Sequence, residues 1–175
     1  MGEIKSTLDL VMEKTKHLTL SPEEKEQQKF DEARKKIKGL IQKYLDGVLD
    51  IERFAKELAG MQETYGSMIN DLLRDELLGG LHLGRDNKLR LTLLSEICGI
   101  DTTGLMPIFD GHHNEIQSAT QDRVKTLKEL LAQKRSISGS AVVPNVEMDK
   151  VWQTEVVAIH AKFDQRLNLE KAKYK

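Results

Sequence analysis

The densest cluster of side chains that could do chemistry in this 175-residue chain lies between Asp110 and Glu115. Its sequence is Asp-Gly-His-His-Asn-Glu, so two adjacent imidazoles stand beside two carboxylates. Imidazole and carboxylate groups are ligands that zinc, nickel and iron accept in proteins. One hypothesis is therefore a metal-dependent enzyme whose metal is held by Asp110, His112, His113 and Glu115.

A structural role for the same residues is the interpretation that we favour. Di-iron sites in helical bundles use two Glu-x-x-His repeats and further glutamates on separate helices. Asp110 and His113 have a comparable spacing only once, and the other histidines are scattered along the chain. We therefore expect Asp110 and the histidines to form a polar turn that caps the next helix. No cofactor and no catalytic residue is assigned.

Other motifs that would indicate an enzyme are absent from the sequence. There is no glycine-rich phosphate loop, no zinc-finger spacing and no Gly-x-Ser-x-Gly elbow. Cys98 is the only cysteine, and one cysteine on an apolar helix face more often packs than reacts. A chain that cannot form an internal disulfide suits a reducing compartment, and no apolar run approaches the length of a membrane span. We expect a cytoplasmic protein that does not enter the membrane.

A seven-residue repeat of large side chains extends through most of the first half of the chain. Spacings that alternate between three and four place both rows of this repeat on one side of a helix, which is typical of a coiled-coil or bundle seam. The first row is Phe30, Ile37, Tyr44, Ile51, Leu58, Tyr65 and Leu72, and the second is Ala33, Leu40, Phe54, Met61 and Met68. The sequence predicts an all-α fold, an antiparallel bundle with long coiled-coil-like helices.

Residues 22–78 are predicted to form a helical hairpin that turns near Gly47. Ser21 and Pro22 suit a helix start, while Gly47 suits the left-handed residue beyond a helix end and Asp50 can cap a second helix. The repeat crosses this turn in phase, so one unbroken helix is the alternative. We favour the hairpin, with its second helix running from Ile51 to Leu78.

The rest of the chain completes a single predicted helical domain, residues 1–175. Residues 81–94 fit either a small β-hairpin or a short helix capped by Asp86, and we prefer the helix. A short N-terminal helix is predicted at 3–17. Residues 81–135 are predicted to contain the middle helices, with a loop at 100–113 and a helix from Asn114 to Arg135. A flexible link at 136–145 and a C-terminal helix at 146–175 complete the chain.

The function that these patterns favour is a helical protein–protein interaction or scaffold protein that self-associates. An apolar stripe wider than one neighbouring helix can cover suggests a homodimer, with Leu58, Tyr65, Met68 and Leu72 in its interface. A third hypothesis is a nucleic-acid-associated accessory factor that uses basic faces of the last two helices. The net charge of −1 provides no overall field to attract nucleic acid, so we expect no such binding.

Overall fold

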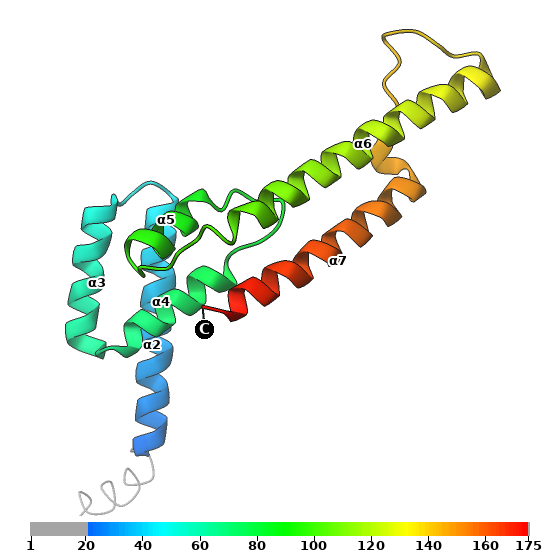
Figure 1. Cartoon of the computed structure of the whole chain (residues 1–175). Coiled ribbons are helices and arrows are strands. Elements are labelled where there is room, and N and C mark those ends of the chain that lie inside the picture. The colour runs from blue at the N-terminus through cyan, green and yellow to red at the C-terminus, as the bar shows by residue number, and fades with distance from the viewer. Residues whose placement is uncertain (1–20, 175) are drawn as a thin grey trace, which may run out of the picture. The chain divides into compact units, whose positions relative to one another are not determined.

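The computed structural model describes residues 21–174, and within that range the protein is all-α with no strand. The helix expected at residues 3–17 lies outside the described residues. No helix between residues 21 and 174 is long and apolar enough to cross a membrane. The described helices are α2 (Pro22–Leu45), α3 (Ile51–Tyr65), α4 (Met68–Gly79), α5 (Lys88–Glu96), α6 (Met106–Arg135) and α7 (Lys150–Ala172), with a 3₁₀ turn at Val146–Met148 (Figure 1).

The chain divides into two compact units, and the division falls inside α4 between Glu76 and Leu77. The first unit contains α2 and α3, and the second contains α5, α6 and α7. The most extensive helix–helix contact in the first unit joins α2 to α3, and that in the second unit joins α6 to α7.

The start of α2 is where the sequence places it, and it forms a complete capping box. The Ser21 side-chain oxygen accepts a hydrogen bond from the backbone N–H of Glu24 at 3.1 Å. The Glu24 carboxylate in turn accepts one from the backbone N–H of Ser21 at 2.7 Å. Two of the N–H groups that every helix start leaves without a partner are thereby satisfied.

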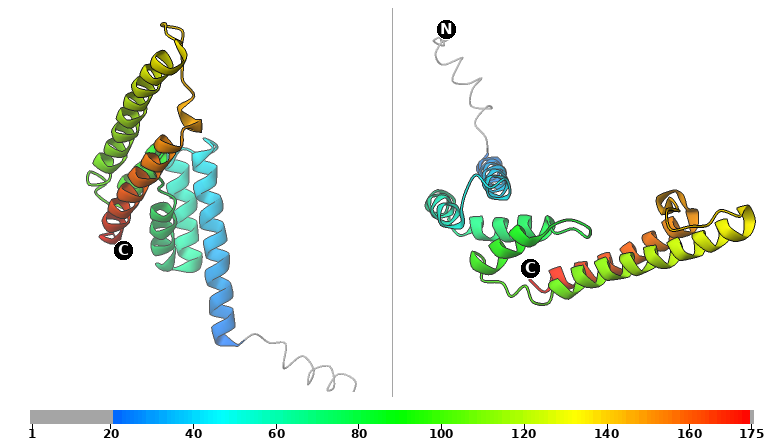
Figure 2. Two further views of the ribbon diagram at one scale, coloured as in Figure 1. Left: turned by 90° about the vertical axis from the view of Figure 1, so that its right-hand side faces the viewer. Right: turned by 90° about the horizontal axis from the view of Figure 1, so that it is seen from above.

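The chain turns between α2 and α3, as Gly47 and Asp50 indicate. Gly47 has a φ of 72°, which a residue without Cβ adopts at little cost. Asp50 caps α3 by accepting a hydrogen bond from the N–H of Arg53 at 2.8 Å. The two helices lie side by side (Figures 1 and 2), and the rings of Tyr44 and Phe54 meet edge to face with their centroids 5.7 Å apart.

The prediction of one helix from Ile51 to Leu78 is wrong, because the helix breaks at Gly66. Gly66 has a φ of 74° and ends α3, and α4 begins two residues later at Met68. A residue with this positive φ cannot continue a right-handed helix, so a single glycine interrupts a repeat that remains in phase. Most side chains of the repeat are nevertheless buried. The buried members are Ala33, Ile37, Leu40, Tyr44, Phe54, Leu58, Tyr65 and Leu72.

Residues 81–94 contain no β-hairpin, and the short helix that we preferred is present as α5. The turn before it is organised by Asn87, which is buried. Its side-chain amide donates to the carbonyl of His82 at 2.8 Å, and its carbonyl oxygen accepts from the N–H of His82 at 3.2 Å. Asp86, the predicted cap, instead accepts from the N–H of Lys88 at 2.9 Å.

The predicted loop at 100–113 is too long, because α6 already begins at Met106. Pro107 stands in the first turn of that helix, where its missing N–H costs nothing. Asp110, His112 and His113 are therefore helical residues, and the polar turn that we expected there does not exist. Helix α7 begins at Lys150, four residues later than predicted, after the 3₁₀ turn.

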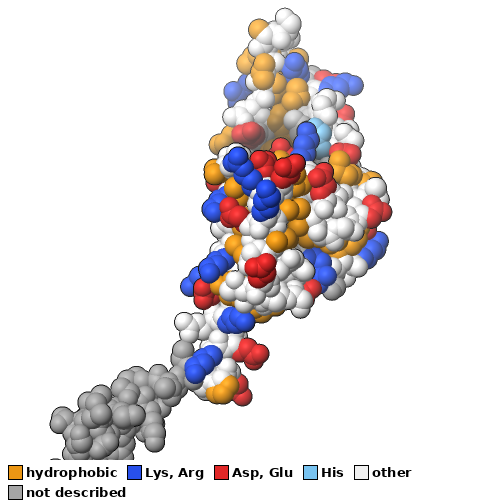
Figure 3. Space-filling view, turned by 90° about the vertical axis from the view of Figure 1, so that its left-hand side faces the viewer, with side chains coloured by type: hydrophobic (Ala, Val, Ile, Leu, Met, Phe, Trp, Pro, Cys, Tyr) orange, Lys and Arg blue, Asp and Glu red, His pale blue; other side chains and the backbone are white. Residues whose placement is uncertain are grey.

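Charged side chains of both signs are interspersed on the face drawn in Figure 3, with hydrophobic side chains between them. This mixture agrees with a composition of 27 basic and 28 acidic residues. No single-sign field dominates that face.

Candidate functional site

The four residues of the metal hypothesis lie on α6, which runs side by side with α7 in the opposite direction (Figures 1 and 2). A buried apolar cluster of Ala119, Ile159 and Phe163 joins the two helices. Gly111 permits the close approach of Phe163, because a Cβ at that position would lie 3.1 Å from the phenyl ring. Three half-buried side chains pack against the cluster, namely Leu83, Ile108 and Ile116.

A pair of histidines lies beside this cluster, one from each helix. His112 is only 5% exposed, and its Nε2 is 3.1 Å from Nδ1 of the half-buried His160. The ring centroids are 4.6 Å apart, and the ring of Phe163 meets His112 edge to face at 5.6 Å. At this separation one ring supplies an N–H and the other a lone pair, so a single proton joins the two nitrogens.

The pKa of His112 lies below its ordinary value. Burial is the main cause, because it disfavours the charged imidazolium. The neighbouring His160 and His113 lower this pKa further, while Asp164 and Glu115 oppose the change. A neutral His112 at neutral pH can accept or donate one hydrogen bond and can ligate a metal.

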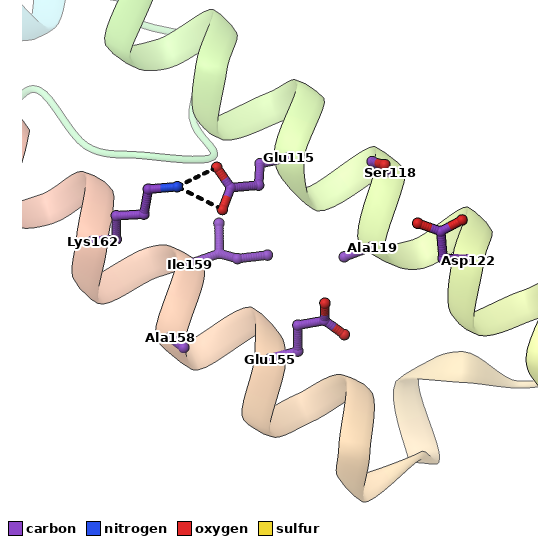
Figure 4. A pocket seen from close by; sticks show the side chains of 8 residues that line it. All are labelled: Glu115, Ser118, Ala119, Asp122, Glu155, Ala158, Ile159 and Lys162. Atoms are coloured by element: carbon purple, nitrogen blue, oxygen red, sulfur yellow. Dashed lines mark hydrogen bonds and ion pairs between the residues drawn. The ribbon is translucent and has the colours of Figure 1, made fainter.

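A shallow acidic groove of about 340 Å³ lies between α6 and α7 (Figure 4). Lys162 of α7 reaches across it and donates to both carboxylate oxygens of Glu115, at 2.8 and 2.7 Å. Asp122 and Glu155 also line the groove, and small side chains form part of its walls. Glu115 is therefore paired with a lysine, which competes with any metal for its oxygens.

The far end of the helix pair is fixed by Asp149, which has two partners. Both carboxylate oxygens accept from Arg123 of α6 at 2.8 Å, and one also accepts from the N–H of Trp152 at 2.9 Å. These bonds hold the pKa of Asp149 below its usual range, chiefly through the Arg123 guanidinium. The indole N–H of Trp152 donates to Oγ1 of Thr120 at 3.1 Å, so it adds a second bond between the helices.

The four residues of the metal hypothesis do not converge in the structure. His112 is buried and contacts α7, Glu115 binds Lys162, and Asp110 and His113 are exposed. Within residues 21–174 no three histidine, cysteine, aspartate or glutamate side chains are grouped as a metal site.

The partner of His112 was missed because 48 residues separate it from His160 in the sequence. Neither residue belongs to a local motif that would link them. One signal was available: His160 follows Ile159, a member of the predicted apolar stripe of the last helix, so it had to lie near the core.

The residues predicted as a homodimer interface are largely covered within the chain. Leu58, Tyr65 and Leu72 are 5%, 8% and 6% exposed, and Met68 is half-buried. The hydroxyl of Tyr65 donates to Glu32 of α2 at 2.8 Å. Their association with a second chain stays a prediction, but their burial already accounts for their apolar character.

No family model, no curated protein and no solved structure matches the chain. The functional argument therefore depends on the described residues alone.

Proposed function

We propose that the protein is a helical interaction protein that forms a homodimer through an exposed stripe on α7. The observation that carries this proposal is the exposure of large apolar side chains at both ends of that stripe. Met148 is 77% exposed, Val151 57% and Leu169 65%. The stripe, which we call the α7 stripe, consists of Val151, Thr154, Ala158, Ala161, Gln165 and Leu169, and Met148 lies just before it in the 3₁₀ turn.

The spacing of the α7 stripe supports a continuous surface. Its members follow one another at intervals of three or four residues, which places them on one side of a helix. Ile159 and Phe163, which pack with Ala119 of α6, belong to the opposite side of α7. Packing against α6 therefore leaves the stripe uncovered. A shallow and mainly apolar depression around Val151, Thr154 and Ala158 lies on it.

The order of sizes along the stripe favours a second copy of the same chain as the partner. Large side chains stand at the two ends and small ones, Ala158 and Ala161, in the middle. Two such helices in antiparallel contact would place Val151 of one chain near Leu169 of the other, with the alanines allowing close approach at the centre. Self-complementarity of this kind is what a two-fold interface requires.

The test compares two valines on the same helix by the mass of the full chain in solution. Val157 is 67% exposed, close to the 57% of Val151, but it lies about 120° from Val151 around the helix, at the edge of the stripe. We expect wild-type protein and Val157→Glu to sediment as dimers at tens of micromolar. Val151→Glu should sediment as a monomer, because it would bury an unpaired charge in the interface.

A wild-type mass of one chain at that concentration would contradict the proposal. Equal dissociation by both glutamate variants would contradict the stripe as the interface. Circular dichroism of each variant shows whether its helices are intact, since both positions are exposed in the single chain.

The other two hypotheses receive no such support from the contacts. The metal-dependent enzyme would need Glu115, which binds Lys162. The nucleic-acid-associated factor would need basic side chains of α6 such as Arg123, which binds Asp149. We propose the cytoplasm as the compartment, from the single cysteine of the sequence.

A further inference from the structure

The histidine pair can hold one proton between its two nitrogens, but not two. With one proton, the N–H of one ring points at the lone pair of the other across 3.1 Å. If both rings are protonated, two N–H groups face each other and two positive charges stand with ring centroids 4.6 Å apart. The contact between His112 and His160 then changes from attraction to repulsion.

The neighbours of the pair do little to relieve that repulsion. On α6 the charged groups near His112 are His113 and Glu115, and Glu115 is already bound to Lys162. On α7 the nearby acid is Asp164, which raises the pKa of His112 by less than burial and His160 each lower it. Two more cations, Lys162 and Arg166, lie over the adjacent Phe163 ring at 5.2 and 5.3 Å. The segment before α5 contributes an apolar side chain, Leu83.

We propose that His112 and His160 form a pH-operated latch on the α6–α7 pair, closed while they share one proton and opened when both rings are charged. The latch goes beyond the proposed dimer, because its residues lie away from the α7 stripe. Opening separates the two helices at their buried cluster of Ala119, Ile159 and Phe163.

The direction of the pH effect follows from burial. The pKa of His112 is lowered in the packed state, so the opened state binds its proton at a higher pH than the closed state does. The closed state is therefore most stable above about pH 6.5, the ordinary histidine value. Its stability falls as the pH drops below that value and stops falling once the packed state is protonated as well.

Trp152 provides a reporter that needs no label. It is the only tryptophan of the chain, and its indole joins α7 to Thr120 of α6. It is half-buried and lies two helical turns from His160, so it responds to helix separation without touching the latch. The neighbouring Asp149 does not titrate in the same range, because its pKa is held below the usual aspartate value.

The experiment follows Trp152 fluorescence and amide hydrogen exchange of α6 and α7 in the full chain between about pH 7.5 and about pH 5. After correction for the intrinsic pH dependence of exchange, we expect the equilibrium constant for opening to increase as the pH falls. The increase should reach up to about tenfold per pH unit for each proton bound. The tryptophan emission should shift to longer wavelength over the same range. His160→Gln should reduce this response, because the amide can accept from His112 but adds no second positive charge, and the response that remains reflects the burial of His112. The matched control is His113→Gln, which removes an adjacent exposed histidine and should keep the response, displaced slightly toward higher pH because His113 lowers the pKa of His112.

A response in His160→Gln as large as that of the wild type would overturn the latch. A pH response that disappears in His113→Gln would also overturn the latch. If His160→Gln does not fold, NMR titration of the wild-type rings decides the question. The latch requires the pKa of His112 to lie clearly below the ordinary histidine value of about 6.5, and a His112 titration at that value would overturn it.

Discussion

The guanidinium of Arg123 binds both carboxylate oxygens of Asp149, and the same carboxylate caps the first turn of α7. One side chain therefore performs two tasks, because it joins α6 to α7 and starts the helix. The two tasks can be separated by substitution.

Asp149→Asn should keep the cap and weaken the ion pair, whereas Asp149→Ala should lose both. We expect the melting temperature at neutral pH to fall in the order wild type, Asp149→Asn, Asp149→Ala, with each step amounting to several degrees. Equal melting temperatures for the two variants would mean that the cap contributes nothing.

The Asp149 carboxylate should also make the stability of the protein depend on pH in the acid range. Its pKa is lowered in the folded state, so its contribution is present above the unfolded value of about 3.9 and is lost as the pH falls through the folded value. The difference in unfolding free energy between wild type and Asp149→Asn should therefore shrink below about pH 4. A difference that stays constant down to acid pH would contradict the ion pair.

Gly66 should resist substitution, while another glycine of the same helix should not. Gly66→Ala places a Cβ at a φ of 74°, so it should lower the free energy of unfolding by about 1–2 kcal/mol. Gly60 is exposed within α3 and has no neighbour within 4 Å of a Cβ, so Gly60→Ala should raise that free energy by up to about 1 kcal/mol. Urea denaturation of both variants makes the comparison, and a loss of stability in Gly60→Ala as large as in Gly66→Ala would refute the turn.

Leu58, an interface residue in the sequence prediction, should behave as a core residue. Leu58→Ala removes a side chain that is 5% exposed and should cost about 2–5 kcal/mol of unfolding free energy. Val151→Ala should change that free energy by about 0.5 kcal/mol or less in the monomer, since its side chain is exposed. Denaturation at low protein concentration separates folding from association, and a small effect of Leu58→Ala would reopen its role as an interface residue.

Added Zn²⁺ or Ni²⁺ should not raise the melting temperature of the full chain. The reason is that Asp110 and His113 are exposed while His112 and Glu115 have partners on α7. A rise that is lost in the His112→Ala, His113→Ala double variant would revive the metal-dependent enzyme.

Local signals in the sequence located helix ends, whereas contacts between distant residues could not be predicted. Ser21, Pro22, Gly47 and Asp50 each act within a few residues, and the structure places them as helix starts and turns. Gly66 was overlooked because the seven-residue repeat continues through it in phase.

The start of α6 was overlooked for a related reason. The loop predicted at 100–113 includes Pro107, although proline suits the first turn of a helix equally well. The pairing of His112 with His160 needed the tertiary fold, because nothing in either local sequence indicates the other.

The central claim is that two chains pair through the α7 stripe, and disulfide cross-linking tests it most directly. Ala161→Cys, in a Cys98→Ser background, places a thiol near the centre of the proposed interface. Gln121→Cys, exposed on α6 and pointing away from α7, is the control. The proposal predicts rapid oxidation of Ala161→Cys to a covalent dimer, with little from Gln121→Cys, at a concentration where the wild type is dimeric. A covalent dimer that forms no faster from Ala161→Cys than from the control would contradict it.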